Sequence, residues 1–335
     1  MRLNLIKRFI FSSPKKQTNL LKNYLAYFLR LPKVYGWPSR LMIEPANFCN
    51  LRCPTCPVGK GAIKKAKGVM SLKNFKKIID QAGDYLYHLT LWNWGEPFLN
   101  KDLAEMIKYA RQKNIYVVTS TNGHFLDKTV CSSIIDSRLS ELIIALDGLS
   151  QETLSQYRVG ANFEKIIQGI KTLVELKRVK QIKYPKIQLQ FIVMKHNQHE
   201  VGKLKNFALD LGVNKAIIKT FGSHLNLGRL KEFEPDKKLS RYAEPIKEEN
   251  QCLKIYLGMN INYDGTVVPC CYDSLESNIL GNVFESGVKQ VWRGDKFTNF
   301  RSAILKNKQA IEICHNCDYN KNIGTTINLN NHEPR

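Results

Sequence analysis

Three cysteines in the segment CNLRCPTCP are the residues of this sequence most suited to metal chemistry. Cys49, Cys53 and Cys56 have the spacing C-x3-C-x2-C, and no fourth cysteine is nearby. Three thiolates from one loop can hold three irons of a [4Fe–4S] cube and leave the fourth iron open to a substrate or cofactor. Zinc is the alternative, but a structural zinc site needs four ligands and the loop adds no histidine. The spacing therefore favours an iron–sulfur cluster with one open position.

A second group of cysteines lies in the last quarter of the chain. A chain in a reducing compartment keeps its thiols free, so clustered cysteines are better interpreted as metal ligands than as disulfides. Cys131 is isolated and is expected to be a small buried apolar residue. The clustered residues are Cys252, Cys270, Cys271, Cys314 and Cys317.

Short apolar runs alternate with longer segments of helical periodicity from residue 40 onward. This alternation predicts parallel strands joined by right-handed helical crossovers. We expect a partial (β/α)6 TIM-type barrel, with an open doubly wound sheet as the alternative fold. The predicted strands are 41–46, 88–94, 115–121, 141–147, 186–193 and 215–220, and the predicted helices between them are 71–83, 101–113, 126–137, 162–179 and 200–212.

Polar residues follow the first four predicted strands. In a βα barrel the loops after the strands carry the chemistry. The cysteine loop follows the first strand, the segment 93–97 follows the second, Ser120 and Asn122 end the third, and Asp147 ends the fourth. The sequence therefore predicts one site at this end of the barrel.

The order of these motifs resembles the radical S-adenosylmethionine (SAM) enzymes over about residues 40–225. The resemblance implies that Cys49, Cys53 and Cys56 bind a [4Fe–4S] cluster whose open iron chelates SAM. Reductive cleavage of SAM would then release a 5′-deoxyadenosyl radical, which abstracts hydrogen from a substrate. The cofactors supply this chemistry, and the protein orients them and excludes water.

The same resemblance implies roles for residues that bind SAM. The segment Asn93, Trp94, Gly95, Glu96 and Pro97 is similar to the GGEP motif of the family, in which the backbone and the glutamate contact the SAM ammonium. Trp94 departs from the motif because it replaces the first glycine. Thr55 also departs, since the residue before the third cysteine is usually aromatic.

The remaining predicted site residues lie after the third and fourth strands. Ser120 and Asn122 match the place of ribose contacts in the family. Arg158 matches an arginine that binds the SAM carboxylate, a pairing that suits its planar guanidinium. Asp147 is expected close to the cofactor and substrate.

The second cysteine group resembles the SPASM module of radical SAM enzymes that modify peptides and proteins. Cys252, Cys270, Cys314 and Cys317 would hold one auxiliary [4Fe–4S] cluster, with a zinc site as the alternative. Cys271 occupies the position of a catalytic aspartate in the sulfatase-maturating members. It is a candidate catalytic hydrogen-atom donor, a substitute ligand, or an inert thiol.

The chain is therefore predicted to have five parts. These are a basic amphipathic segment (1–39), the radical SAM core (40–229), a linker (230–250), the SPASM-like module (251–320) and a polar, disordered tail (321–335).

The charge distribution bears on partners and location. The formal net charge is +22, but the lysines are dispersed, which argues against specific nucleic-acid binding. Residues 1–40 contain nine basic residues and no acidic one, beside apolar residues at helical spacing. This segment either packs on the domain or makes a peripheral membrane contact through residues 1–35. No apolar run is long enough to span a membrane, so the expected location is cytoplasmic, with membrane association as an alternative.

Two classes of function are compatible with these motifs. The first is a radical SAM enzyme that modifies a peptide or protein, or oxidises or epimerises a sugar or envelope metabolite, with a reductant such as ferredoxin or flavodoxin. The second is a non-enzymatic iron–sulfur electron-transfer protein. Because an electron carrier would not need Glu96, Asn122, Arg158 or an open iron, we expect the enzyme.

Overall fold

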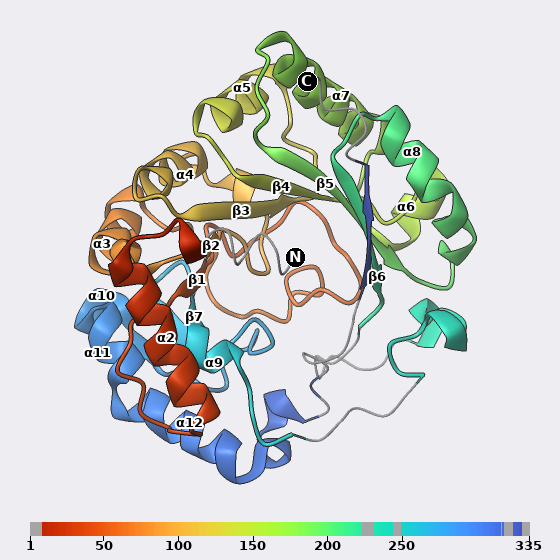
Figure 1. Ribbon diagram of the computed structural model, residues 1–335. Coiled ribbons are helices and arrows are strands. Elements are labelled where there is room, and N and C mark those ends of the chain that lie inside the picture. Colours follow the sequence, from red (N-terminus) through yellow and green to blue (C-terminus); the bar gives the residue numbers. More distant parts are fainter. Residues whose placement is uncertain (1–8, 223–230, 244–248, 316, 318–323, 330–335) are drawn as a thin grey trace.

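The computed structural model describes residues 9–222, 231–243, 249–315, 317 and 324–329 (Figure 1). Within these residues, one ten-stranded sheet has the strand order β10-β6-β5-β4-β3-β2-β1-β7-β8-β9. The curved sheet surrounds a central space, and helices cover its outer face.

Six parallel strands form the partial barrel, as predicted. They are β1 (Arg40–Ile43), β2 (His88–Thr90), β3 (Tyr116–Thr121), β4 (Glu141–Ala145), β5 (Lys186–Val193) and β6 (Lys215–Thr220). The predicted helices are also present, as α3 (Leu72–Ala82), α4 (Leu103–Gln112), α5 (Lys128–Asp136), α7 (Phe163–Val179) and α8 (Leu204–Asp210). A further helix, α6 (Gln151–Tyr157), begins in a capping box at Ser150 and had no counterpart in the prediction.

The two faces of the barrel strands differ in chemistry. On β5, Leu189 and Phe191 are fully buried beneath the helices. Gln190 and Ile192 occupy the alternate positions and line an internal cavity. Since side chains alternate along a strand, apolar residues support the helical layer while the inner face keeps polar groups for a site.

The barrel does not close, and other strands cover both of its edges. At β1 the sheet continues through β7 (Gly258–Ile261), β8 (Thr266–Val268) and β9 (Gly281–Asn282). At the other edge, β10 (Gly324–Asn328) pairs antiparallel with β6. The prediction of a disordered tail is therefore wrong for residues 324–328. Their backbone pairs with the edge of β6, which would otherwise be open.

Helical segments of the C-terminal part pack below the barrel strands in Figure 1. They are α9 (Lys254–Leu257), α10 (Val283–Ser286), α11 (Val288–Arg293) and α12 (Asp295–Asn307). The short 3-10 helices are η1 (Gly83–Tyr85), η2 (Pro97–Leu99), η3 (Gln198–Lys203), η4 (Lys231–Phe233), η5 (Lys237–Leu239), η6 (Lys308–Ala310) and η7 (Glu312–Cys314).

Two segments outside the strand and helix pattern pack on the barrel. The N-terminal helix α2 (Pro14–Phe28) contacts α9 and η1. Within the predicted linker, Phe233 is buried against Tyr157, and Arg241 donates to Thr220. Among the described residues, no helix combines the length and apolarity that a membrane crossing requires.

Candidate active site

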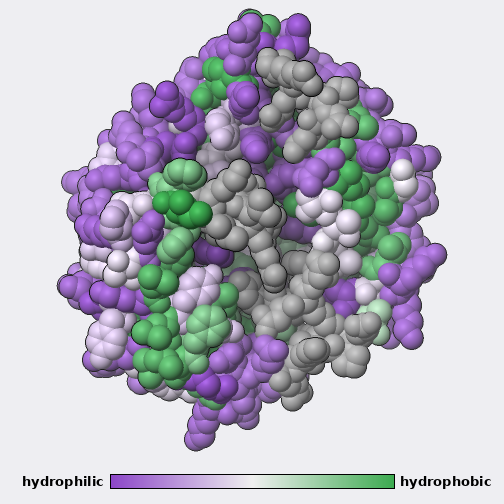
Figure 2. Space-filling view, viewed as in Figure 1, coloured by the Kyte–Doolittle hydropathy of each residue, from purple (hydrophilic) through white to green (hydrophobic). Residues whose placement is uncertain are grey.

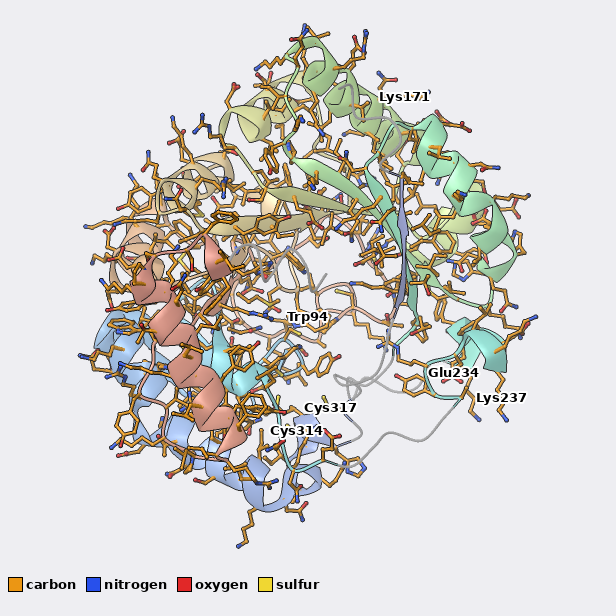
Figure 3. The ribbon with its side chains drawn as sticks, in the orientation of Figure 1. Trp94, Lys171, Glu234, Lys237, Cys314 and Cys317 are labelled. Atoms are coloured by element: carbon orange, nitrogen blue, oxygen red, sulfur yellow. The ribbon has the colours of Figure 1, made fainter. Side chains whose placement is uncertain are left out.

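One cavity of about 300 Å³ brings together most of the predicted site residues. It lies at the carboxyl ends of the barrel strands, where each loop leaves its strand. Figure 3 shows Trp94 in the centre, between the barrel strands and the segment that carries Cys314 and Cys317. The predicted residues that line the cavity are Cys49, Cys53, Cys56, Asn93, Trp94, Gly95, Glu96, Ser120, Asn122 and Arg158.

Two of the three cysteines of the first loop have side-chain hydrogen-bond donors as close neighbours, and the third, Cys56, lies 3.9 Å from the Trp94 carbonyl oxygen. The Asn122 side-chain amide lies 3.6 Å from the Cys49 sulfur, and the Arg158 guanidinium lies 3.8 Å from the Cys53 sulfur. Burial raises the pKa of Cys49 to about 11, so this thiol stays protonated until a metal favours the thiolate. Three thiols that line one cavity, two of them beside hydrogen-bond donors, fit the ligand set of an iron–sulfur cluster.

No three His, Cys, Asp or Glu side chains of the described part of the chain are arranged to hold one metal ion. An iron–sulfur cluster needs a wider arrangement of ligands than a single ion does, because each cysteine binds a separate iron.

The segment 93–97 is held by a close backbone approach at Gly95. A Cβ atom on Gly95 would lie 2.0 Å from the Ala46 carbonyl oxygen, in the loop that precedes the cysteines. Only glycine allows the two loops to approach so closely. Pro97 does not line the cavity; it begins η2 and is buried.

Glu96 is buried beside the cysteine loop, and its carboxylate accepts three hydrogen bonds. They come from the Thr121 hydroxyl at 2.8 Å, the Asn122 backbone N–H at 2.8 Å and the Phe98 backbone N–H at 3.2 Å. Burial nevertheless raises the pKa of Glu96 to about 7. A carboxylate has about four lone-pair sites, so one remains for a ligand, and a cationic ligand there would stabilise the charged form.

Asp147 does not face the cavity, contrary to the prediction. Its side chain is fully buried and accepts from Arg158 Nε at 2.7 Å and from the Ile192 backbone N–H at 2.7 Å. Burial lowers the pKa of Arg158, but the negative charge of Asp147, together with Cys53 and Tyr157, outweighs burial and the net shift is upward. Both Asp147 oxygens are occupied within the protein, so Asp147 is a positioning residue that aims Arg158 at the cavity.

The four predicted auxiliary ligands line a second, smaller cavity. Cys252, Cys270, Cys314 and Cys317 all belong to its wall. Tyr272 lines both cavities and thus separates the two cysteine sets.

Cys271 and Trp94 connect the two parts of the site. The Trp94 indole N–H donates to the Cys271 carbonyl at 3.0 Å, and the Lys254 ammonium lies 3.7 Å from the Cys271 sulfur. The residue that departs from the family motif therefore binds the C-terminal module. The other departure, Thr55, is hydrogen-bonded to the Tyr157 hydroxyl at 2.5 Å.

The sequence analysis missed several residues on the inner face. Thr121, Tyr157, Gln190 and Tyr272 line the cavity. Lys219 pairs in register with the cavity residue Ile192, which places the two on the same face of the sheet. In the strand sequence KAIIKT, side chains alternate between the two faces of the sheet. This alternation could have indicated that Lys219 is a charged residue on the inner face.

Lys219 is a half-buried cation on this inner face. Burial, assisted by the charge of Arg241, lowers its pKa, while Asp147 and Cys271 act in the opposite direction. Within the described residues, its ammonium makes no hydrogen bond and no ion pair. A half-buried cation without such a partner can bind an anionic ligand.

Comparison with known families identifies the two domains in which the cysteine sets lie. The model of the radical SAM superfamily matches residues 43–207, and the model of the SPASM iron–sulfur cluster-binding domain matches residues 252–318. The chain is a radical SAM protein with a SPASM domain. Members of this superfamily are enzymes, so the electron-carrier alternative is not retained. The family implies SAM, the [4Fe–4S] cluster that binds it, and auxiliary iron–sulfur clusters in the SPASM domain.

Relatives and solved structures agree with this assignment. The radical SAM chain is 26% identical over 224 residues to a probable GTP 3′,8-cyclase of Saccharolobus islandicus, covering 66% of this chain and 70% of the relative. It is 22% identical over 324 residues to the PqqA peptide cyclase of Rhizobium meliloti, covering 87% and 82%.

Among structures, Streptococcus suis SuiB bound to its precursor peptide SuiA superposes with a TM-score of 0.67 at 17% identity, covering 87% of this chain and 74% of SuiB. The AdoMet-bound anSMEcpe superposes with a TM-score of 0.62 at 16% identity, covering 82% and 88%. These likenesses show the partial-barrel fold with a C-terminal extension.

Proposed function

We propose that this radical SAM enzyme abstracts a hydrogen atom from a peptide or small-molecule substrate bound in the barrel cavity. The observation that carries the proposal is the cavity that Cys49, Cys53 and Cys56 share with Glu96, Asn122 and Arg158. A reductant such as ferredoxin or flavodoxin would supply the electron.

Different residues of the cavity would bind different groups of SAM. The three cysteines would hold the cluster, and Glu96 would accept from the SAM ammonium through its remaining lone-pair site. Arg158, fixed by Asp147, would donate to the SAM carboxylate. When bound, the reduced cluster and SAM together supply a 5′-deoxyadenosyl radical that abstracts hydrogen. Ser120, which lines the same cavity, would contact the ribose, and Trp94 and Tyr272 would cover the cavity from the side of the SPASM domain.

The inner face further supports a substrate with an anionic group. Lys219 lies beside Ile192, and Arg241 is held against the end of β6 by its bond to Thr220. A carboxylate or phosphate between these cations would offset the cost of burying Lys219. The relatives are compatible with several substrate types, since PqqA peptide cyclase and SuiB are named with peptides and the GTP cyclase with a nucleotide.

Lys219→Gln tests the proposed anion site. We expect substrate-independent release of 5′-deoxyadenosine to be unchanged. We expect about ten-fold weaker binding of pyrophosphate, used as a probe in calorimetry, because one charge-assisted hydrogen bond is lost. Lys215→Gln is the control, since Lys215 lies on the same strand but is paired with Glu141 at 2.8 Å. Equal pyrophosphate binding by both variants would remove the anion site and leave the radical chemistry untouched.

The test of the proposed activity is anaerobic release of 5′-deoxyadenosine. The reconstituted protein is reduced and given SAM, beside a variant in which Cys49, Cys53 and Cys56 are alanine. Nucleoside from the wild type alone supports the proposal. If protein with verified clusters releases none, with or without candidate peptides and sugars, the proposal is wrong.

A further inference from the structure

The N-terminal helix α2 is packed with its polar side inward. Its buried residues are Lys16, Asn19, Asn23 and Ala26. The Asn19 and Asn23 amides donate to the Trp37 carbonyl at 3.1 and 2.8 Å, and the Lys16 ammonium donates to the Lys113 carbonyl at 3.1 Å. Hydrogen bonds to backbone carbonyls thus attach this helix to the domain, where amphipathic helices normally use their apolar side.

The apolar side of α2 faces outward. Leu21, Leu25 and Phe28 are 59%, 58% and 70% exposed and follow one another at helical spacing. Ile10 and Phe11, which precede α2, and Leu29, which caps its end, are also exposed. We call these six residues the apolar strip; it is the green band along α2 in Figure 2. A contiguous apolar surface of this kind marks an interaction site.

Cations accompany the apolar strip. A surface groove of about 500 Å³ lies beside α2, and its wall includes Lys15, Lys22, Arg293, Tyr35 and Trp37. Lys15 is paired with Asp84 at 2.9 Å. Among the described residues, Lys22 makes no hydrogen bond or ion pair.

The charge of this surface decides between candidate partners. Residues 1–40 hold nine basic residues and no acidic one. At the described surface, Lys15, Lys22 and Arg293 line the groove, and a second copy of the chain would bring two such groups of cations together and be repelled. An apolar strip bordered by cations and aromatic side chains instead complements a bilayer, with apolar side chains among the acyl chains and lysines at anionic headgroups.

We propose that the apolar strip and the groove beside it bind an anionic phospholipid surface and hold the enzyme at the membrane as a peripheral protein. The contact is independent of the radical chemistry, because α2 lies outside the cavity that holds the cysteines.

The test is sedimentation of the full-length reconstituted protein with phosphatidylcholine vesicles, with and without phosphatidylglycerol. We expect binding to the anionic vesicles that falls as salt is raised. The triple variant Leu21→Gln/Leu25→Gln/Phe28→Gln is expected to bind about a hundred-fold more weakly. Lys22→Gln is expected to bind about five-fold more weakly.

Helix α7 provides matched controls at the opposite end of the molecule. Val179 is equally exposed, and Lys171, labelled in Figure 3, is an exposed lysine. Val179→Gln and Lys171→Gln should bind vesicles as the wild type does. All variants should release 5′-deoxyadenosine at the wild-type rate, which shows that they are folded.

Three results would overturn the proposal. They are no wild-type sedimentation with anionic vesicles, equal binding with and without phosphatidylglycerol, and wild-type binding by the triple variant. A dimer that forms without vesicles and is lost in the triple variant would instead identify a second copy as the occupant.

Discussion

Replacing Asp147 with asparagine tests whether this residue positions Arg158. Asp147 is fully buried and Arg158 is 16% exposed, with Nη2 and Nε at 2.5 and 2.7 Å from the same carboxylate oxygen. Asparagine keeps the size and can still accept from the Ile192 N–H, but it leaves the guanidinium without its counter-charge. Removing one partner of a buried ion pair costs about 3–5 kcal/mol. Because Arg158 keeps some exposure, we expect about 3 kcal/mol, or a fall of about 6 °C in the unfolding midpoint.

The same substitution should weaken the binding of SAM. An arginine that is no longer held in place loses a charge-assisted contact worth about 1.5–3 kcal/mol, which is about ten- to hundred-fold in affinity. Anaerobic equilibrium dialysis with labelled SAM measures this, and scanning fluorimetry measures the midpoint.

The control for Asp147 is an exposed ion pair. Asp136→Asn removes the partner of Lys180, 3.0 Å away on the surface, and should cost less than about 1 kcal/mol. If Asp147→Asn unfolds at the same temperature as Asp136→Asn and binds SAM like the wild type, Asp147 does not position Arg158.

Three further predictions concern single residues. In the SAM-free protein, the raised pKa of Glu96 means that the folded state binds a proton at Glu96 more tightly than the unfolded state does. The contribution of this proton to the free energy of unfolding is complete below about pH 4.5 and is lost, by about 3 kcal/mol, as the pH rises through about 7. Glu96→Gln should remove this pH dependence from the unfolding midpoint measured between pH 5 and 8. If the midpoints of the variant and the wild type change in parallel with pH, the prediction is refuted. Gly95→Ala should cost more than about 2 kcal/mol and abolish SAM cleavage because of the clash with Ala46, whereas Gly202→Ala, with open space around it, should stay within about 0.5 kcal/mol in the same unfolding assay. Cys271→Ala should keep 5′-deoxyadenosine release but abolish product if the thiol is catalytic; unchanged product by mass spectrometry would show that it is not.

The sequence contained the strands and the ligand sets because both depend on local patterns. All six barrel strands were predicted, since a buried strand needs a run of apolar residues whatever it later contacts. The spacing of Cys49, Cys53 and Cys56 likewise indicates a cluster because one short loop supplies all three ligands. The place of Gly95 and Glu96 in the site was predicted from the order of the motifs alone.

Tertiary structure decided the contacts between residues distant in the chain. Trp94 reaches Cys271, 177 positions away, and Lys219 joins the inner face only through the register of β5 and β6. Asp147 ends a strand in sequence, yet the side chain of Arg158 and the backbone of β5 bind both its oxygens.

Segments near the two ends of the chain show the same difference between what the sequence predicts and what the tertiary structure decides. Composition alone predicted that residues 324–328 belong to a polar, disordered tail. In the structure, the open edge of β6 supplies a partner for their backbone. The apolar residues at helical spacing within residues 1–40 predicted a helix, and α2 is present there. Their spacing did not reveal which side faces the domain, because that depends on the carbonyls of Trp37 and Lys113, which accept hydrogen bonds from α2 only after the barrel has folded.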